Sequence, residues 1–561
     1  MKRRDFLKSL PIGVAAAAVP FTVGGLFSGK AFGRSPAFDA LLNSQTGTDN
    51  ILVIINLQGG NDGLNTVIPF NDPIYRSKRA DIGYVKGSEI SGLTYTIRGD
   101  LALNPPLGSD FYNLYKAGKL AVIQNVGYAN PDRSHFRATD IWNTASDSNI
   151  IVSSGWMGRF LETQVSPNYP LDVQKGDDPV AIQIDYSTSL SFQGSRSVMA
   201  SAVYDPSNYK GATNYTDDPV LNNNYGSELG YVRAILTEAD VYGQRFTEIF
   251  GKPDATKNIA TYPTGNSLAT QLQKVAWCIK GGLKTRVYFV TLGGFDTHVN
   301  QFTKDPAQGQ GLLHKYLGEA IAAFQSDIEA LGFGDNVLGM TYSEFGRRVN
   351  QNGSQGTDHG TAAPMFLFGK QVNGEVYGRH PNLTPNTPSD PTSLDQYGDL
   401  TAQFDFRQVY AALLTQWFGL NDNLRKTILN KPEVTTTSDF TDGSNGFKFP
   451  VNGSGLMQNL ISNPAVISVA DPAGASFELN PNNPNPFRGV TTINFALSEG
   501  GYALVEVFDS RGTLIATLVN GYVGRGKNQV VFDARSLPSG SYFVRLDYQG
   551  KIRTQQINLI K

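Results

Sequence analysis

The 561-residue sequence is poor in the residues that cross-link a chain or bind nucleic acid. It has a single cysteine, Cys278, which excludes an intramolecular disulfide. Charge of neither sign dominates, since 47 Lys and Arg stand against 49 Asp and Glu. Because no block of basic residues is present to neutralise a phosphate backbone, we expect no nucleic-acid partner.

A strongly apolar membrane segment is also missing. The weakly apolar stretch 12–27 is interrupted by Pro20 and by glycines, so we expect no permanent transmembrane segment. Arg3 and Arg4 precede this stretch in a twin-arginine pattern, and small residues follow it near Gly33. We therefore predict a twin-arginine (Tat) signal peptide over residues 1–33, with a Sec signal or a lipid-free anchor carrying chance arginines as the alternative.

What is present is an alternation of strands and helices. Continuous apolar runs predict buried strands at 51–57, 120–126, 286–292, 336–341 and 365–368. Residues 311–331 lie between two of these runs, and their apolar residues recur every three or four positions, as in a helix. This pattern predicts an α/β fold with a mostly parallel sheet and helices on both faces, in which ligands collect beyond the carboxyl ends of the strands.

The C-terminal part has a different composition. Residues 433–455 are polar and rich in Gly, Thr and Ser, as in a linker. Short alternating strands separated by turns follow from residue 477 and predict an Ig-like β-sandwich. We therefore expect a main domain over 45–430, a linker over 431–475 and a sandwich over 476–561.

Three motifs in that sandwich suggest its role: NPNPF at 483–487, VFDSRG at 507–512 and LPSGSYF at 537–543. Together they resemble the C-terminal sorting domain of type IX secretion substrates. The resemblance implies that the type IX machinery exports the protein through the periplasm to the cell surface or medium. A generic Ig-like adhesion or carbohydrate module is the alternative.

Acidic and histidine residues stand where the predicted strands of the main domain end. The candidate metal ligands are Asp62, Asp296, His298, Glu344, Asp358 and His359. Asp296 and His298 are two residues apart, so in extended chain both point to one side and can reach one ion. Carboxylate and imidazole ligands suit Zn, Mg, Mn or Ca. The alternative for an isolated D-x-H triplet is an Asp that caps a turn beside a satisfied His.

Candidate catalytic residues follow the strand 120–126. Ser134 stands at a predicted helix start, where it is either an ordinary N-cap or a nucleophile that receives a phosphoryl or sulfuryl group. Thr66 is the next candidate nucleophile. Arg133, Arg347 and Asn65 are candidates for steadying a substrate anion. His314, inside the predicted helix, is interpreted as a packing or surface residue.

The motifs at 57–66, 133–136, 155–159, 293–298, 343–347 and 356–360 together resemble the family of domain of unknown function 1501. The resemblance implies an alkaline-phosphatase-like fold shared with sulfatases, and two metal ions with a nucleophile between them. Asp62 would hold one ion, and Asp296 with His298 the other. Either Asp358 and His359 form the adjacent Asp-His pair of the superfamily, or Glu344 and His359 are the ligands, which leaves Phe345 in a ligand position.

These features predict an exported metal-dependent hydrolase of phosphate or sulfate esters, acting on a small-molecule or polysaccharide ester. The competing interpretation is a non-catalytic surface protein on a degenerate alkaline-phosphatase-like fold, with at most one structural ion. The retention of polar residues at several strand ends favours the enzyme.

Overall fold

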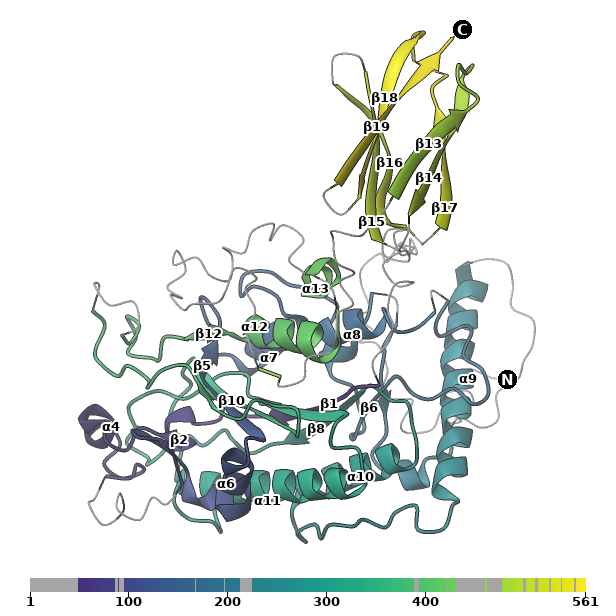
Figure 1. Cartoon of the computed structure of the whole chain (residues 1–561). Coiled ribbons are helices and arrows are strands. Elements are labelled where there is room, and N and C mark those ends of the chain that lie inside the picture. The colour runs from purple at the N-terminus through teal and green to yellow at the C-terminus, as the bar shows by residue number, and fades with distance from the viewer. Residues whose placement is uncertain are drawn as a thin grey trace. The chain divides into compact units, whose positions relative to one another are not determined.

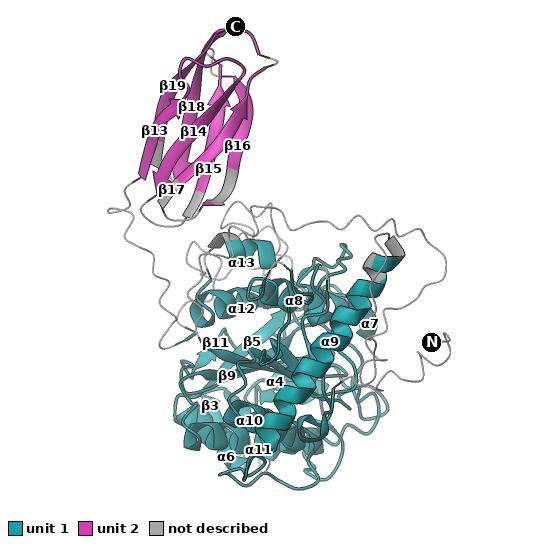
Figure 2. Ribbon diagram, turned by 90° about the vertical axis from the view of Figure 1, so that its right-hand side faces the viewer, with its two compact units in different colours: residues 1–24, 48–465 teal, residues 25–47, 466–561 magenta. Residues whose placement is uncertain are grey.

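The structure is a computed structural model that describes residues 49–85, 89, 95–166, 168–195, 197–211, 224–387, 393–420, 422–429, 460–461 and, with gaps at 498–500, 510–512, 524–525, 536 and 549–550, 477–560. These residues form two compact units, one within 49–461 and one within 477–560 (Figure 2). The predicted signal peptide 1–33 lies outside them, as does most of the predicted linker 431–475. Within that linker, Leu460 and Ile461 are buried on the first unit, where Asn373 N donates to Leu460 O at 3.0 Å.

The first unit is built on one mixed sheet. Its strands are β1 (Ile51–Leu57), β5 (Leu120–Gly127), β6 (Ala181–Gln183), β7 (Ser201–Ala202), β8 (Val287–Leu292), β9 (Val337–Tyr342), β10 (Ala363–Phe368), β11 (Val376–Tyr377) and β12 (Phe404–Asp405). They run in the order β11-β5-β10-β9-β1-β8-β6-β7, with β12 paired to β5. The pairings are parallel except those of β10, which is antiparallel to β5 and β9. The predicted mostly parallel sheet is confirmed.

Helices cover both faces of this sheet (Figure 1). On one face lie α6 (Gly108–Lys116), α10 (Ser267–Lys280) and α11 (Gly309–Ala330), whose apolar side chains form one core with those of β1 and β8. On the other lie α7 (His135–Thr144), α8 (Trp156–Leu161) and α12 (Phe406–Ala412). There Trp142 stacks on Tyr342 of β9 and on Phe406, with ring centroids 5.4 and 4.5 Å apart.

Smaller elements complete the unit. A three-stranded sheet of β2 (Val67–Ile68), β3 (Thr96–Arg98) and β4 (Leu101–Leu103) follows β1, together with α4 (Pro73–Lys78). The long helix α9 (Asn224–Phe250) and the short α13 (Asp422–Ile428) lie at the periphery (Figure 1). Among the described helices, none combines the length and apolarity that crossing a membrane requires.

The second unit is a β-sandwich, as predicted. One antiparallel sheet contains β13 (Phe477–Asn483), β14 (Val490–Leu497) and β17 (Gly526–Asp533), and the other β15 (Gly501–Phe508), β16 (Leu514–Val523), β18 (Gly540–Tyr548) and β19 (Lys551–Leu559). Alternate residues of these strands, such as Ile493, Val505 and Val544, point into one shared core. The unit therefore has its own hydrophobic core.

Candidate metal centre

Four side chains converge at the carboxyl edge of the sheet: His135, Asp296, His298 and His359, here called the histidine cluster. His135 follows β5, and Asp296 and His298 follow β8. His359 precedes β10, and because β10 is antiparallel to its neighbours, its first residue lies at the edge where β5 and β9 end. Strands far apart in the sequence therefore bring these side chains to one place.

The ligand atoms of the histidine cluster are close together. The Nε2 atoms of His298 and His359 lie 2.9 Å apart. Asp296 Oδ1 is 3.1 Å from Nε2 of His298, 3.2 Å from that of His359 and 3.6 Å from that of His135. Among the described residues, His135, Asp296 and His359 have ligand atoms within 4.8 Å of one another, which is close enough for them to share a metal ion.

Glu344 orients His135. This carboxylate is buried at the end of β9, and its Oε1 accepts from Gly59 N at 2.9 Å and lies 2.8 Å from His135 Nδ1. Gly59 has φ +120°, and a Cβ there would meet Asp296 N at 2.4 Å, so only glycine fits. An Nδ1–H donated to Glu344 leaves the Nε2 lone pair of His135 facing the cluster.

The other two histidines are held in the same way. His298 Nδ1 lies 3.2 Å from Asp358 Oδ1, and His359 Nδ1 lies 2.8 Å from the carbonyl oxygen of Arg133. A carbonyl only accepts, so His359 must donate from Nδ1 and present an unprotonated Nε2. Burial lowers the pKa of His359, which favours the neutral ring that can bind a metal.

Asp296 is kept ionised beside these rings. Partial burial raises its pKa, but the hydrogen bond from Arg347 and the positive charge of that guanidinium are among the effects that outweigh burial and bring the pKa to about 2. Arg347 Nη2 lies 2.6 Å from Asp296 Oδ1. The buried Arg347 also donates to the carbonyl oxygens of Gly59, Gly60 and Thr357. Its guanidinium therefore positions Asp296 and the loop after β1, whereas the sequence had suggested Arg347 as a residue that steadies a substrate anion.

The sequence assigned Glu344 and Asp358 as metal ligands, and the structure gives them another place. Their oxygens lie at Nδ1 of His135 and of His298, away from the point where the Nε2 atoms meet. Phe345 packs against the rings of His135 and His359, with centroids 4.8 and 4.6 Å away. His135 takes a place in the cluster that the sequence did not give it, although its motif directly follows β5.

Asp62 does not reach the histidine cluster. It turns into the protein, where it forms an ion pair with Arg79, both side chains being fully buried, and accepts from Gln301 Nε2 at 2.7 Å. Asn65 and Thr66 lie in the same buried polar network. Asn65 Nδ2 donates a hydrogen bond to Thr303 Oγ1, and Thr66 Oγ1 donates one to the carbonyl oxygen of Asp62. Both side chains are buried, as is Asp62, whose Oδ1 has no hydrogen-bond partner.

His314 belongs to that network. It is buried on α11, with Nε2 3.1 Å from Thr66 Oγ1 and Nδ1 2.8 Å from Asn104 Nδ2. Burial lowers its pKa to about 3. The packing role predicted for His314 is thus fulfilled by a neutral, hydrogen-bonded imidazole.

We expect stability to fall in acid because of His314. In the unfolded chain its pKa is near 6.5, so below that pH the unfolded state binds a proton that the folded state excludes. Above pH 6.5 His314 does not lower the free energy of unfolding. As pH falls from 6.5 towards 3, the free energy of unfolding decreases by up to about 1.4 kcal/mol per pH unit because of this residue. Urea unfolding of wild type and His314→Gln between pH 7 and 4 measures it. Equal pH slopes for the two proteins would contradict this account.

Ser134 and Arg133 lie at the rim. Ser134 is the exposed N-cap residue of α7, one residue before His135, and its N–H donates to Asp132 Oδ1 at 2.7 Å. The Arg133 guanidinium pairs with Asp399 and lies over the Tyr397 ring at 5.2 Å. Both residues are therefore accessible beside the cluster.

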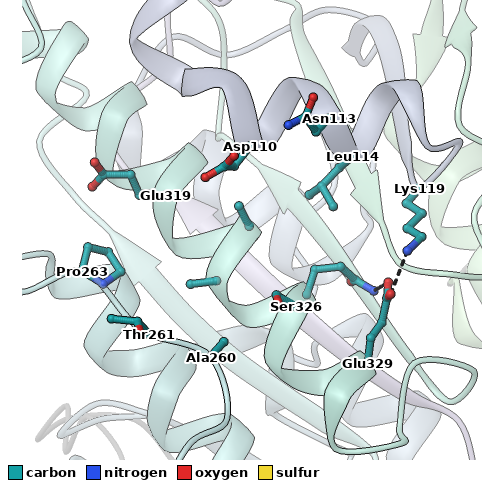
Figure 3. Close-up of a pocket in the computed structure, with 13 residues that line it drawn as sticks. Asp110, Asn113, Leu114, Lys119, Ala260, Thr261, Pro263, Glu319, Ser326 and Glu329 are labelled. Atoms are coloured by element: carbon teal, nitrogen blue, oxygen red, sulfur yellow. Dashed lines mark hydrogen bonds and ion pairs between the residues drawn. The ribbon is translucent and has the colours of Figure 1, made fainter.

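A separate groove of about 660 Å³ lies between α6, α11 and the loop at 260–263 (Figure 3). Asp110, Glu319 and the ion pair of Lys119 with Glu329, at 2.7 Å, are among its lining groups. None of the histidine cluster lines it. The convergent ligand atoms lie at the strand ends, apart from this groove.

Comparison with known families agrees with the two resemblances. Residues 282–430 match the model described as protein of unknown function (DUF1501), and this span contains Asp296, His298, Glu344 and His359. Residues 483–560 match the secretion system C-terminal sorting domain. The sandwich is thus a type IX sorting domain, and the protein is exported to the cell surface or secreted. No curated protein matches the chain.

Solved structures with detectable likeness are distant. PorZ, a surface component of the type IX secretion system of Porphyromonas gingivalis, is 20% identical over 19% of this chain, with a TM-score of 0.12, and the chain spans only 14% of its length. An alkaline phosphatase superfamily protein from Vibrio parahaemolyticus is 11% identical, and the match covers 68% of this chain and 72% of that one, with a TM-score of 0.28. The alkaline phosphatase of the Antarctic bacterium TAB5 is 10% identical (59% and 94%, TM-score 0.24). Such scores assign no residue roles.

Proposed function

We propose that the protein is an exported metal-dependent hydrolase of phosphate or sulfate esters, and that the histidine cluster holds its ion. The observation that supports this most is that ligand atoms of His135, Asp296 and His359 lie within 4.8 Å of one another, with His298 Nε2 2.9 Å from His359 Nε2. The Nε2 atoms of His298 and His359 lie 2.9 Å apart, a contact that is favourable with either a proton or a metal cation between the two nitrogens, and Asp296 Oδ1 beside them favours a cation.

The spacing of the ligand atoms fits such an ion. Bonds of about 2.0–2.1 Å to a tetrahedral Zn²⁺ require ligand atoms about 3.3 Å apart. The distances from Asp296 Oδ1 to the three Nε2 atoms, 3.1, 3.2 and 3.6 Å, bracket that value. A set rich in imidazole favours Zn²⁺ over Mg²⁺ or Ca²⁺, which prefer oxygen ligands. A bound divalent ion would polarise the ester and lower the pKa of water.

Residues at the rim supply the remaining functions. The guanidinium groups of Arg133 and Arg348, 29% and 42% exposed, both lie beside Asp399 and can donate to a phosphate or sulfate. Ser134 is the proposed nucleophile. Its oxygen would bond to phosphorus or sulfur while the bond to the alcohol breaks, and the hydroxyl proton would pass to the alcohol oxygen. Water would then release the group and restore the hydroxyl.

The test is hydrolysis by the purified full chain. We expect Zn²⁺-loaded protein to cleave nitrophenyl phosphate or nitrophenyl sulfate, to lose the activity in EDTA and to regain it with Zn²⁺. Ser134→Ala should lose most of the activity and still bind the ion, whereas Ser77→Ala, at an exposed serine of α4, should behave as wild type. A protein that binds no ion and cleaves neither ester would be the non-catalytic surface protein instead.

A further inference from the structure

Two tyrosines form an exposed stack at the carboxyl edge of the sheet, away from the histidine cluster. Tyr186 and Tyr204 have ring centroids 4.4 Å apart and planes only 9° from parallel. They are 55% and 53% exposed. Single exposed apolar side chains are ordinary, but two held parallel on separate loops are an organised surface.

The structure behind the rings fixes them. Lys274 of α10 lies with Nζ 4.3 Å from the Tyr204 centroid and donates to the Tyr204 carbonyl at 2.6 Å. One face of a ring cannot hold both this ammonium and a stacked tyrosine at such distances, so the two lie on opposite faces of Tyr204. Tyr186 is therefore the outermost layer, and its second face is the one available to a ligand.

The loops that carry the two rings are themselves braced. Asp185 Oδ1 accepts from Tyr186 N at 2.6 Å. After Tyr204, Asp205 accepts from Ser207 N at 3.1 Å and from Asn208 Nδ2 at 2.7 Å. A ligand that stacks on Tyr186 would thus bind a preformed surface, so little conformational entropy of the loops would be lost on binding.

The position relates this stack to the histidine cluster. Tyr186 follows β6 and Tyr204 follows β7, and both strands run parallel to β8, which ends before Asp296. The two tyrosines therefore lie at the same edge of the sheet as the cluster. Neighbouring strands are about 4.8 Å apart, so β7 is roughly 10 Å from β8. A ligand that reaches both places must be an extended molecule.

We propose that Tyr186, backed by Tyr204 and Lys274, binds a sugar ring of a polysaccharide whose phosphate or sulfate ester is the substrate; the ester part rests on the proposed function. A pyranose ring presents a flat face of C–H groups, which suits the negative face of an aromatic ring. Asp185, Ser187 and Asn208 on the same loops offer partners for its hydroxyls. The stacked bases of a nucleic acid are disfavoured, because the chain has a formal charge of −2 and no basic block.

Native electrophoresis of the full chain, in gels containing chondroitin sulfate, xylan, laminarin or dextran, tests binding with EDTA present, so that it does not depend on hydrolysis. At least one polymer should retard the wild type. Tyr186→Ala should bind that polymer about two- to twelvefold more weakly, in line with the roughly 0.5–1.5 kcal/mol of an aromatic pair. Tyr186→Phe keeps the ring and should bind within about twofold of wild type. Tyr231→Ala, which removes an exposed tyrosine of α9, is the control.

Retardation by none of the four polymers, or equal retardation of wild type and Tyr186→Ala, would overturn the proposal. A second measurement separates it from the proposed function. If the chain is a hydrolase, Tyr186→Ala should lower kcat/KM for the retarding polymer, as its phosphate or sulfate ester, and leave that for nitrophenyl esters unchanged. Tyr186-dependent binding without any hydrolysis would refute the hydrolase and support the sugar site. Hydrolysis of nitrophenyl esters without polymer binding would support the hydrolase and refute the sugar site.

Discussion

Replacing Asp296 and His359 together by alanine is expected to remove the bound divalent ion and all ester hydrolysis. The two side chains place Oδ1 and Nε2 3.2 Å apart at the centre of the histidine cluster, and without them only His135 and His298 remain. An ion at a hundred times its dissociation constant stabilises the folded state by about 2.7 kcal/mol. EDTA should therefore lower the Tm of wild type and leave that of the double variant unchanged.

Metal content by elemental analysis and Tm with and without EDTA measure this effect. His380→Ala is the matched control, because His380 is also half-buried and beside a carboxylate, with Nε2 3.8 Å from Asp72, but lies outside the cluster. It should bind as much metal as wild type. Equal metal content in wild type and the double variant would rule out the histidine cluster as the ion site.

Replacing Arg79 by alanine is expected to destabilise the first unit by about 3–5 kcal/mol. Its guanidinium pairs with Asp62, and both side chains are fully buried. Arg79 also donates to the carbonyl oxygens of Val349, at 3.0 Å, and Arg348, at 2.7 Å. The variant would leave a buried carboxylate without its cation and two carbonyls without these donors, and each is costly in a medium of low dielectric.

Urea unfolding measures the loss of stability in Arg79→Ala. Metal analysis of the folded fraction shows whether Asp62 has a structural role or is a metal ligand. Lys119→Ala is the control, because its pair with Glu329 is about one-third exposed and such a pair contributes at most about 1 kcal/mol. Folded Arg79→Ala should bind as much metal as wild type. Loss of metal at unchanged stability would instead return Asp62 to the ion site that the sequence first assigned to it.

Much of the fold follows from local sequence. The run 51–57 predicts β1 to the residue, and 286–292 and 336–341 predict β8 and β9 to within one residue. A continuous apolar run between polar turns identifies a buried strand wherever it lies in the chain, because only a strand covered on both faces tolerates it. The sorting motifs between 483 and 543 likewise act through local turns and alternation, so they could be identified without knowledge of the main domain.

The sequence therefore determined the strands, the export domain and the set of polar residues at strand ends, but only the tertiary structure decided which of these residues meet. The antiparallel direction of β10 brings His359 to the edge where β5 ends, and so to His135, more than two hundred residues away along the chain. The same order of strands places Glu344 behind His135 and turns Asp62 inward to Arg79. The order and direction of the strands depend on packing between segments that are distant in the sequence. The periodicity of apolar residues is a local property, so it does not predict them.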